Sequence, residues 1–438
     1  MADHGLPCVH CGLCLDSCPT YRLLGVESES PRGRLYLMDA ITKGEMALDA
    51  DAAGHLSRCL GCLACEAACP SGVDYGHRIE EVRPLLAARR DPQQAWKAAT
   101  RGLYTNDALV DAGLATARLM DRAGLSSLRR RMPGLGLLPG DQDGADADTT
   151  PLRRSREHQP LRPRARAALL TGCVGDRMRP GINRDAVEML QRCGVEVVEV
   201  PGQGCCGALA LHSGDRQGAM AAARTNTTAF LAADVDFVVS TAAGCGAMLA
   251  DYGHLLETTP EHEAALALAA AARDVCEVLV EMGLEAPPVP LPIEGTVAYH
   301  DACHLLHARG IADAPRLVCE AAVGRAPVDL GENAICCGSA GSYNLDHPSL
   351  AAALGERKAE LAREGEVALL AVANVGCMLQ IAQALARGGS RARVAHPVQL
   401  LAEAWRQEPG HDLRREPSPA AGPAKGRQGH EEDRRDGD

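Results

Sequence analysis

Cys8-Val9-His10-Cys11-Gly12-Leu13-Cys14-Leu15-Asp16-Ser17-Cys18-Pro19 stands near the start of the chain, and Cys59-Leu60-Gly61-Cys62-Leu63-Ala64-Cys65-Glu66-Ala67-Ala68-Cys69-Pro70 repeats its pattern. Both stretches read C-x2-C-x2-C-x3-C-P, the spacing with which bacterial ferredoxins bind a [4Fe–4S] cluster. Two copies within the first 70 residues argue strongly against a chance match. The pattern predicts two iron–sulfur clusters.

The motif also predicts how the eight cysteines divide between the clusters. Three closely spaced cysteines bind one cluster, and the cysteine before proline reaches across to the other. We therefore expect cluster 1 to be bound by Cys8, Cys11, Cys14 and Cys69, and cluster 2 by Cys59, Cys62, Cys65 and Cys18. A pair of structural zinc sites is the alternative, but such sites are typically built from separated C-x2-C pairs. This segment is predicted to carry electrons.

The composition limits the class of protein. The 438 residues are 46% hydrophobic and 23% charged, as in a globular protein of two or three domains. The net charge of -12 argues against nucleic acid as the main partner. No apolar run approaches the ~20 residues that span a bilayer, and the N-terminus lacks the pattern of a signal peptide. We expect a cytoplasmic protein, peripheral at most on the cytoplasmic face of the inner membrane.

The chain has 19 cysteines, of which eight lie in the two runs and eleven lie beyond residue 170. Since the cytosol keeps thiols reduced, we interpret them as metal ligands rather than disulfides.

Residues 20–58 separate the two runs, and apolar residues recur at helical spacing within 33–41. This pattern favours an α-helical ferredoxin module over the short β-rich segment of small ferredoxins. Pro31-Arg32-Gly33-Arg34 places two cations near the clusters. They would raise a reduction potential or meet an acidic partner, or they form a solvated turn before a helix.

The rest of the chain divides by pattern. Residues 77–135 are rich in Ala, Leu and Arg, which predicts helices. Residues 138–163 are rich in Pro, Gly, Asp and Arg, which predicts a flexible connector. From residue 164, strands alternate with helices, which predicts parallel βαβ units. The predicted fold is multidomain: a helical ferredoxin module and two repeated α/β domains. We place the boundaries at 1–90 (ferredoxin module), 91–163 (helices and linker), 164–290 (first repeat), 291–406 (second repeat) and 407–438 (disordered tail).

An internal repeat links the two α/β domains. Cys173 recurs as Cys303, Cys205-Cys206-Gly207 as Cys336-Cys337-Gly338, and Gly244-Cys245 as Gly376-Cys377. All of these motifs are predicted to follow strands, where parallel sheets place their sites. The candidate ligands are Cys173, Cys205, Cys206 and Cys245 in the first repeat, and Cys303, Cys336, Cys337 and Cys377 in the second. Each set could bind a cluster or a zinc ion, or all eight could build one shared site.

Seven other residues are candidates for structural or supporting roles. We interpret Cys193, Cys276 and Cys319 as core residues because they lie in apolar helical stretches. His300 and His304 flank Cys303 and could bind metal or carry a proton, although orienting the loop is the more common role. Asn374 and Ser342 are predicted to support the cysteine loops rather than to act in catalysis.

The whole pattern resembles a known set of redox subunits. This set includes the iron–sulfur subunits of glycolate oxidase, lactate utilisation systems and anaerobic glycerol-3-phosphate dehydrogenase, and parts of heterodisulfide reductase. Within this set, the sequence resembles the glycolate oxidase subunit most, over about residues 5–405. The segments that carry the resemblance are Cys8–Gly12, Cys18–Gly25, Pro31–Leu37, Ser240–Gly246 and Cys336–Tyr343. The repeats of heterodisulfide reductase end in C-x-x-C, whereas this chain has Met248 and Gln380 at the last position. The unusual non-cubane cluster of that enzyme is therefore not expected.

The resemblance implies an electron-transfer subunit of a glycolate dehydrogenase that oxidises glycolate to glyoxylate. FAD would sit on a partner subunit, because no G-x-G-x-x-G follows a strand in this chain. Electrons would then pass to a quinone-type acceptor, and no catalytic residue is expected here. The alternatives are a lactate or glycerol-3-phosphate dehydrogenase subunit, an enzyme that acts alone, and a zinc-bound assembly scaffold.

Overall fold

The computed structural model describes residues 8–89, 107–129, 132, 160 and 162–407. All but the first residue of the predicted tail 407–438 and nearly all of the predicted connector 138–163 lie outside these residues, as do 90–106, 130–131 and 133–135 of the predicted helical stretch. The predicted domain boundaries stay predictions.

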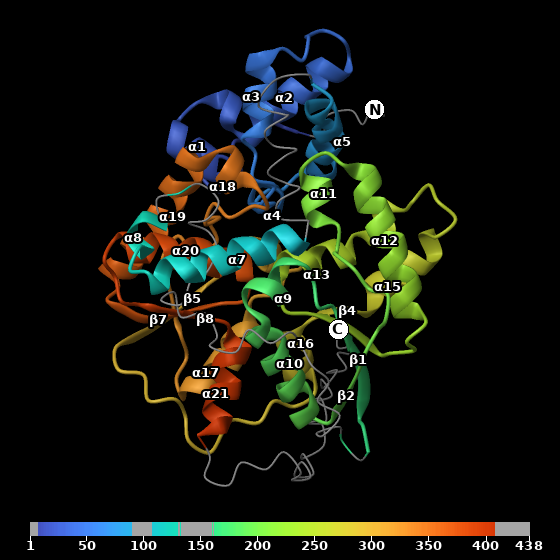
Figure 1. Ribbon diagram of the computed structural model, residues 1–438. Helices are drawn as coiled ribbons and strands as arrows, with labels where there is room; N and C mark the ends of the chain where they lie inside the picture. Colours follow the sequence, from blue (N-terminus) through green and yellow to red (C-terminus); the bar gives the residue numbers. More distant parts are fainter. Residues whose placement is uncertain (1–7, 90–106, 130–131, 133–159, 161, 408–438) are drawn as a thin grey trace, which may run out of the picture.

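The N-terminal module, drawn in blue in Figure 1, is α-helical as predicted. No strand occurs between residues 8 and 89. Its helices are α1 (Pro19–Leu24), a 3-10 turn (Glu27–Glu29), α2 (Pro31–Thr42), α3 (Ala50–Ser57), α4 (Ala64–Ala67) and α5 (Tyr75–Ala87). Leu35, Met38, Ile79 and Val82 form the centre of its core.

The Pro31–Arg34 motif forms the start of α2, and its two arginines lie in different environments. Ser30 caps the helix by accepting a hydrogen bond from the backbone N–H of Gly33, and proline suits the first helical position. Position 33 requires glycine, because a Cβ there would lie 2.0 Å from the carbonyl oxygen of Glu27. Arg32 lies at the surface and pairs with Glu27, whereas Arg34 is buried.

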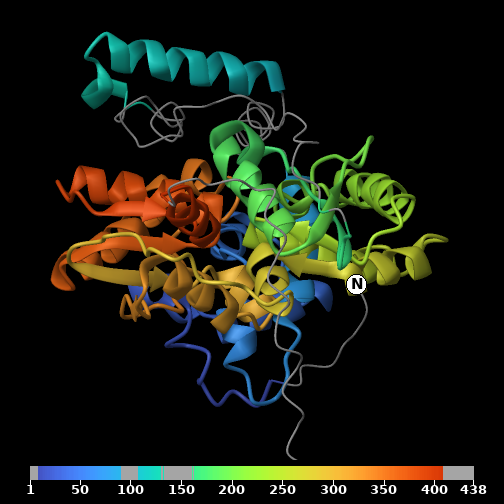
Figure 2. The same cartoon turned by 90° about the horizontal axis from the view of Figure 1, so that it is seen from below.

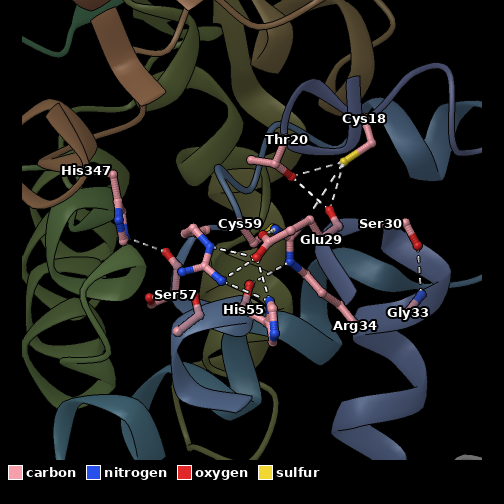
Figure 3. A network of polar contacts seen from close by, with 12 residues as sticks. Cys18, Thr20, Glu29, Ser30, Gly33, Arg34, His55, Ser57, Cys59 and His347 are labelled. Carbon is pink, nitrogen blue, oxygen red and sulfur yellow. Dashed lines mark hydrogen bonds and ion pairs between the residues drawn. The ribbon is translucent and has the colours of Figure 1, made fainter. Parts of the chain in front are cut away.

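A buried carboxylate, Glu29, ties this module together (Figure 3). Its oxygens lie 2.7 Å from the Arg34 guanidinium, 2.5 Å from Nδ1 of His55 and 2.6 Å from Nε of Arg58. Burial acts to raise the pKa of Glu29, but the hydrogen bonds from Arg58 and His55 and the charge of Arg34 outweigh it and hold that pKa below its usual range. The 3-10 turn, α2 and the end of α3 therefore meet at one charge cluster.

The two repeats have the same topology, as predicted. The first sheet has the order β2-β1-β3-β4, with strands β1 (Ala165–Leu169), β2 (Val195–Val198), β3 (Phe237–Ser240) and β4 (Ala272–Asp274). The second has the order β6-β5-β7-β8, with strands β5 (Thr296–His300), β6 (Val328–Asp329), β7 (Val367–Val372) and β8 (Arg393–Ala395). Every strand pair is parallel. Consecutive residues of β1 enter two different cores, Ala167 one and Ala168 the other, as expected of a sheet covered on both faces.

Helices connect the strands of each sheet (Figures 1 and 2). The first repeat has α9 (Val174–Met178), α10 (Pro180–Arg192), α11 (Ala208–His212), α12 (Arg216–Leu231), α13 (Ala243–Ala250), α14 (Tyr252–Leu255), α15 (His262–Ala271) and α16 (Val275–Glu281). The second has a π-helical turn η4 (His304–Ala308), α17 (Asp313–Val323), α18 (Tyr343–Asp346), α19 (Pro348–Glu364), α20 (Val375–Arg387) and α21 (Pro397–Arg406). In the described part of the chain between the N-terminal module and the repeats lie the helices α7 (Asp107–Arg122) and α8 (Ser126–Arg129).

One hydrophobic core runs through both repeats, which lie side by side in Figure 2. The last helix of the second repeat, α21, packs against α10 of the first, and Arg406 reaches Asp185 and Glu188 there. Cys276 and Cys319 are fully buried in this core, and Cys193 packs partly exposed against it. Cys276 and Cys319 are thus core residues, as predicted, whereas Cys193 lies at the edge of the core.

The N-terminal module is fastened to both repeats by hydrogen bonds. The hydroxyl of Tyr343 and the ring of His347 bond to the backbone carbonyls of Arg58 and Ser57, both at 3.0 Å. On the side of the first repeat, Nε2 of His77 lies 3.0 Å from Asp251.

Among the residues that the structure describes, no helix is both long and apolar enough to cross a membrane.

We predict that Glu29→Gln lowers the free energy of unfolding by about 3–5 kcal/mol, because it leaves Arg34 buried without its countercharge. Chemical denaturation of the cofactor-loaded protein measures the loss. Since folding lowers the pKa of Glu29, this loss is full at neutral pH and shrinks as the pH falls below about 4.5. The control is Glu27→Gln, whose exposed pair with Arg32 is worth at most about 1 kcal/mol. Equal losses in both variants would contradict the assignment.

Candidate metal centres

The eight cysteines of the two runs line two neighbouring hollows. Cys8, Cys11, Cys14 and Cys69 line a hollow near the surface. Cys18, Cys59, Cys62 and Cys65 line a second hollow in the interior. The structure therefore groups the cysteines as the crossed motif predicts, with the cysteine before proline joining the set of the other run. Cys65 also borders the first hollow, so the two sites are adjacent.

The backbone of both loops has the shape that a cluster requires. The residues on either side of the middle cysteine have a positive φ: His10 (55°) and Gly12 (83°) around Cys11, and Gly61 (65°) and Leu63 (62°) around Cys62. For His10 and Leu63 this conformation costs roughly 1–2 kcal/mol each, because a Cβ crowds the following carbonyl. Glycine follows the middle cysteine in the first loop and precedes it in the second, but the positive φ values occur at the same two positions in both loops. Strain of this kind persists where a bound group compensates it, so the loops fit [4Fe–4S] clusters.

The second hollow has polar groups directed at its sulfurs. The hydroxyl of Tyr75 donates to Sγ of Cys59 at 3.4 Å, and the hydroxyl of Thr20 lies 3.3 Å from Sγ of Cys18. The buried Arg34 guanidinium also lies 3.9 Å from that sulfur. Thr20 donates its proton to the carbonyl of Glu29 at 2.9 Å, so Tyr75 and Arg34 are the groups that stabilise the more negative, reduced state of a cluster and so raise its potential. One of the two predicted roles of the Arg34 cation is thus supported by its position.

In the first repeat, the structure brings Cys173, Cys205, Cys206 and Cys245 together beyond the ends of β1, β2 and β3. Sγ of Cys173 lies 3.4 Å from Sγ of Cys205, and Cys206 hydrogen-bonds to both Cys205 and Cys245. Hydrogen bonds from Cys173 and Cys206 lower the pKa of Cys205, which makes it the thiolate of the group. Only Cys206 is fully buried.

In the second repeat, Cys303, Cys336, Cys337 and Cys377 form the same chain of thiols, and all four are buried. Cys336 takes the place of Cys205, since hydrogen bonds from Cys303 and Cys337 lower its pKa. The side-chain amide of Asn374 donates to Sγ of Cys377 at 3.1 Å, the supporting role predicted for it. Ser342 instead hydrogen-bonds to Asp346. Thiol contacts thus run within each repeat and do not require the shared site of eight.

The residues at the position of a fifth cysteine have structural roles. Met248 is buried in the core of the first repeat. The amide of Gln380 donates to the carbonyl of Ala351 at 2.8 Å. Neither side chain belongs to its group of thiols.

The two histidines beside Cys303 differ. Nδ1 of His304 lies 3.6 Å from Sγ of Cys303, and its ring lies 5.7 Å from that of His212 in the first repeat. His300 is completely buried at the end of β5 near Cys337 and Cys377. Burial lowers the pKa of His300 well below its usual range, so the ring is neutral. The hydrogen-bonding role expected of such residues does not apply to His300.

A contact that the sequence does not reveal joins the two halves of the molecule. Leu60, Cys62 and Ala64 pack in one buried cluster with Cys303 and Cys336. The second hollow therefore adjoins the thiols of the second repeat, although Cys62 and Cys303 are 241 positions apart in the sequence. No motif in one chain could have predicted this pairing, because it depends on how the module docks.

Comparisons with known proteins agree with this arrangement. A family profile described as a 4Fe-4S dicluster domain matches residues 5–73, and one described as a cysteine-rich domain matches residues 167–250 and 297–382. The probable glycolate oxidase iron-sulfur subunit of Bacillus subtilis is 35% identical over 91% of this chain and 94% of its own. The glycolate oxidase iron-sulfur subunit of Escherichia coli is 32% identical over 92% and 94%.

Two further matches are narrower. Lactate utilization protein A of Geobacillus kaustophilus is 32% identical over 54% of this chain and 98% of its own. A crystal structure of a hypothetical protein from Helicobacter pylori matches 88% of this chain and 69% of its own, with a TM-score of 0.50 and 11% identity, a likeness of fold alone.

The fold, the paired cysteine sets and the matching domains define an iron–sulfur electron-transfer protein, a subunit of an oxidoreductase. More particularly, the chain belongs to the family of glycolate oxidase iron–sulfur subunits. The predicted resemblance is confirmed.

We predict that the crossed ligand sets can be read by EPR of the dithionite-reduced protein. Cys69→Ser should alter the same cluster signal as Cys14→Ser, and Cys18→Ser the same signal as Cys59→Ser, because each pair lines one hollow. Cys193→Ser, outside every set, is the control. The crossed assignment would be wrong if Cys69→Ser changed the signal that Cys59→Ser changes.

We also predict that Tyr75→Phe lowers the potential of one cluster by roughly 20–60 mV. This is the loss of one hydrogen bond of about 0.5–1.5 kcal/mol for a one-electron couple. Potentiometric EPR titration measures the shift, and exposed Tyr36→Phe is the control. An unchanged potential would show that the Tyr75 hydroxyl does not act on the cluster.

Proposed function

We infer that this chain is the iron–sulfur subunit of a glycolate dehydrogenase complex. In that complex a partner subunit with FAD oxidises glycolate to glyoxylate, and this chain passes the electrons on to a quinone-type acceptor. The proposal is supported by the end-to-end matches to glycolate oxidase iron–sulfur subunits. The observation that carries it is the continuous succession of four cysteine sites through the molecule.

The order of the sites follows from their contacts. The hollow of Cys8, Cys11, Cys14 and Cys69 shares Cys65 with the next hollow. That hollow meets the second repeat through Cys62, Cys303 and Cys336. The second repeat meets the first where η4, which follows Cys303, packs against α13, which holds Cys245. We therefore propose the order cluster 1, cluster 2, second-repeat centre, first-repeat centre.

The burial of the thiols suits a relay with two open ends. Cys11, in the first site of the series, is exposed, and Cys173, Cys205 and Cys245, in the last, are partly exposed. In the middle of the series, Cys18, Cys59, Cys62 and Cys65 and all four thiols of the second repeat are buried. One end is thus accessible to an electron donor and the other to an acceptor.

Within this scheme the clusters, when bound, take up and release single electrons. The residues of the chain do the rest. The thiolates bind the clusters, Tyr75 and Arg34 stabilise added negative charge, and the apolar residues Leu60 and Ala64 exclude water between the two halves. The chain needs no residue that binds glycolate.

Two other functions compete with this one. A lactate or glycerol-3-phosphate dehydrogenase subunit would use the same relay, and the lactate utilization relatives match about half of the chain. A scaffold with zinc in both repeats would fit groups of four thiols. Iron, sulfide and zinc analysis separates the scaffold from the relay, because zinc in the repeats leaves only two paramagnetic clusters.

The test of the proposal is to purify the native complex and to compare glycolate, lactate and glycerol 3-phosphate as substrates. We expect glycolate to give the highest kcat/KM. Cys14→Ser and Cys65→Ser should abolish quinone reduction but leave flavin reduction by glycolate intact, and Cys193→Ser should change neither. Loss of flavin reduction in an intact Cys14→Ser complex would contradict the relay role, and a preference for lactate would contradict the substrate.

A further inference from the structure

His300 is a buried polar side chain without a partner. It is the last residue of β5, its exposed fraction is 0%, and neither ring nitrogen hydrogen-bonds to any residue that the structure describes. Burying such a group without a hydrogen bond costs on the order of 1–3 kcal/mol, so an unpartnered imidazole in a core requires an explanation. A bound ligand that uses the nitrogen is one of the few available.

The neighbours of His300 are thiols of the second repeat. A ring nitrogen of His300 and the sulfurs of Cys337 and Cys377 all lie within 4.8 Å of one another. Ligands about 2.0–2.3 Å from a tetrahedral metal lie roughly 3.3–3.8 Å apart, so these three donors need to close by about 1 Å on a metal between them. Imidazole with thiolates is a donor set used by both zinc and iron–sulfur centres.

The first repeat lacks this group. His300 precedes Cys303 by three residues, and the residue three before Cys173 is Leu170. Leu170 is buried in an apolar core with Ala168 and Cys206. The position three residues before the first cysteine is therefore hydrophobic in the first repeat and an unpartnered imidazole in the second.

A second difference between the repeats is a buried charged side chain that lies beside the thiols of the second repeat only. Gly207 and Gly338 of the Cys-Cys-Gly loops have φ values of 90° and 89°, and each contacts an alanine of the next long helix, Ala219 and Ala351. Seven residues beyond these alanines stand Asn226 in the first repeat and Lys358 in the second. Lys358 is 1% exposed, donates to the carbonyl of Glu332 and faces the thiols Cys336 and Cys337. A buried ammonium of this kind balances a negatively charged centre.

We propose that an imidazole nitrogen of His300 takes the place of one thiolate among the ligands of the second-repeat metal centre, the others coming from the group Cys303, Cys336, Cys337 and Cys377, whereas thiolates alone bind the centre of the first repeat. The two repeats then hold unequal centres in the same fold. Replacing a thiolate by neutral imidazole raises the potential of an iron–sulfur centre, as in Rieske proteins. The centre next to cluster 2 would accordingly attract electrons more strongly than its counterpart in the first repeat.

The experiment is pulsed EPR on the isolated full-length subunit, prepared with ¹⁴N- or ¹⁵N-histidine. The wild type should show the strong nitrogen coupling of a directly bound imidazole, which changes with the label. His300→Leu, which installs the residue of the first repeat, should abolish this coupling. His304→Leu, at the histidine beside Cys303, is the matched control and should keep it. Coupling that survives in His300→Leu would overturn the proposal.

His300→Cys covers the case in which the leucine variant loses the centre or fails to fold. A cysteine can still bind metal, so this variant should keep the iron content, lose the nitrogen coupling and shift the midpoint potential of one centre to a lower value. An unchanged potential and spectrum would overturn the proposal. If the second repeat holds zinc, X-ray absorption at the zinc edge should show one nitrogen that His300→Leu removes, and a sulfur-only shell would overturn it.

This proposal rests on metal binding in the second repeat and not on the identity of the substrate. All readouts are made on the subunit without glycolate or a flavin partner. A complex that prefers another 2-hydroxy acid would contradict the proposed function and leave the role of His300 untouched.

Discussion

The packing of the second cysteine run against the second repeat is the contact on which the rest of the structure depends. Leu60, Cys62 and Ala64 share a buried cluster with Cys303 and Cys336. Without this contact the molecule would be a ferredoxin attached to an α/β protein. With it, two separate sets of sites become neighbours inside a shared dry interior, which is where charge interactions are strong.

Charged groups buried in that interior are stabilised by neighbouring groups of opposite charge. A carboxylate inside the ferredoxin module is tolerable because Arg34, His55 and Arg58 surround Glu29. The same arginine contacts the sulfur of Cys18, so one side chain both neutralises the carboxylate and acts on cluster 2. Tyr343 and His347 then bond to the backbone of the segment that bears this network, and they come from the repeat that cluster 2 faces. The stability of the module and the placement of its second site are thus coupled.

The sequence predicts much of this architecture because its main motifs are local. Two cysteine runs of fixed spacing specify two loops, and each loop reaches the same backbone form whether glycine stands before or after the middle cysteine. The repeat is detectable because the same cysteine motifs recur in the same order, and Gly207 and Gly338 of these motifs both have the positive φ that glycine allows. The helical module follows from the spacing of apolar residues in one segment, and the parallel pairing of the strands from the rule that alternating strands and helices form parallel sheets. The order of the strands was not predicted.

What could not be predicted depends on distant partners. Glu29 looks like an ordinary surface acid in the sequence, and its three cations come from two other helices and the loop after them. Arg34 and Arg32 look equivalent in the Pro31–Arg34 motif, but only the fold shows that one is inside and the other outside. His300 and His304 likewise read as a pair around Cys303, and only the burial of His300 without a partner separates them.

The burial of the central thiols has a consequence for how the protein is made. Cys62, Cys303 and Cys336 lie where the N-terminal module closes over the second repeat, and none is accessible in the closed molecule. A cluster is too large and too charged to diffuse through a packed interface. We therefore expect the buried centres to be inserted while the module is still undocked, so that metal delivery comes before the last folding step.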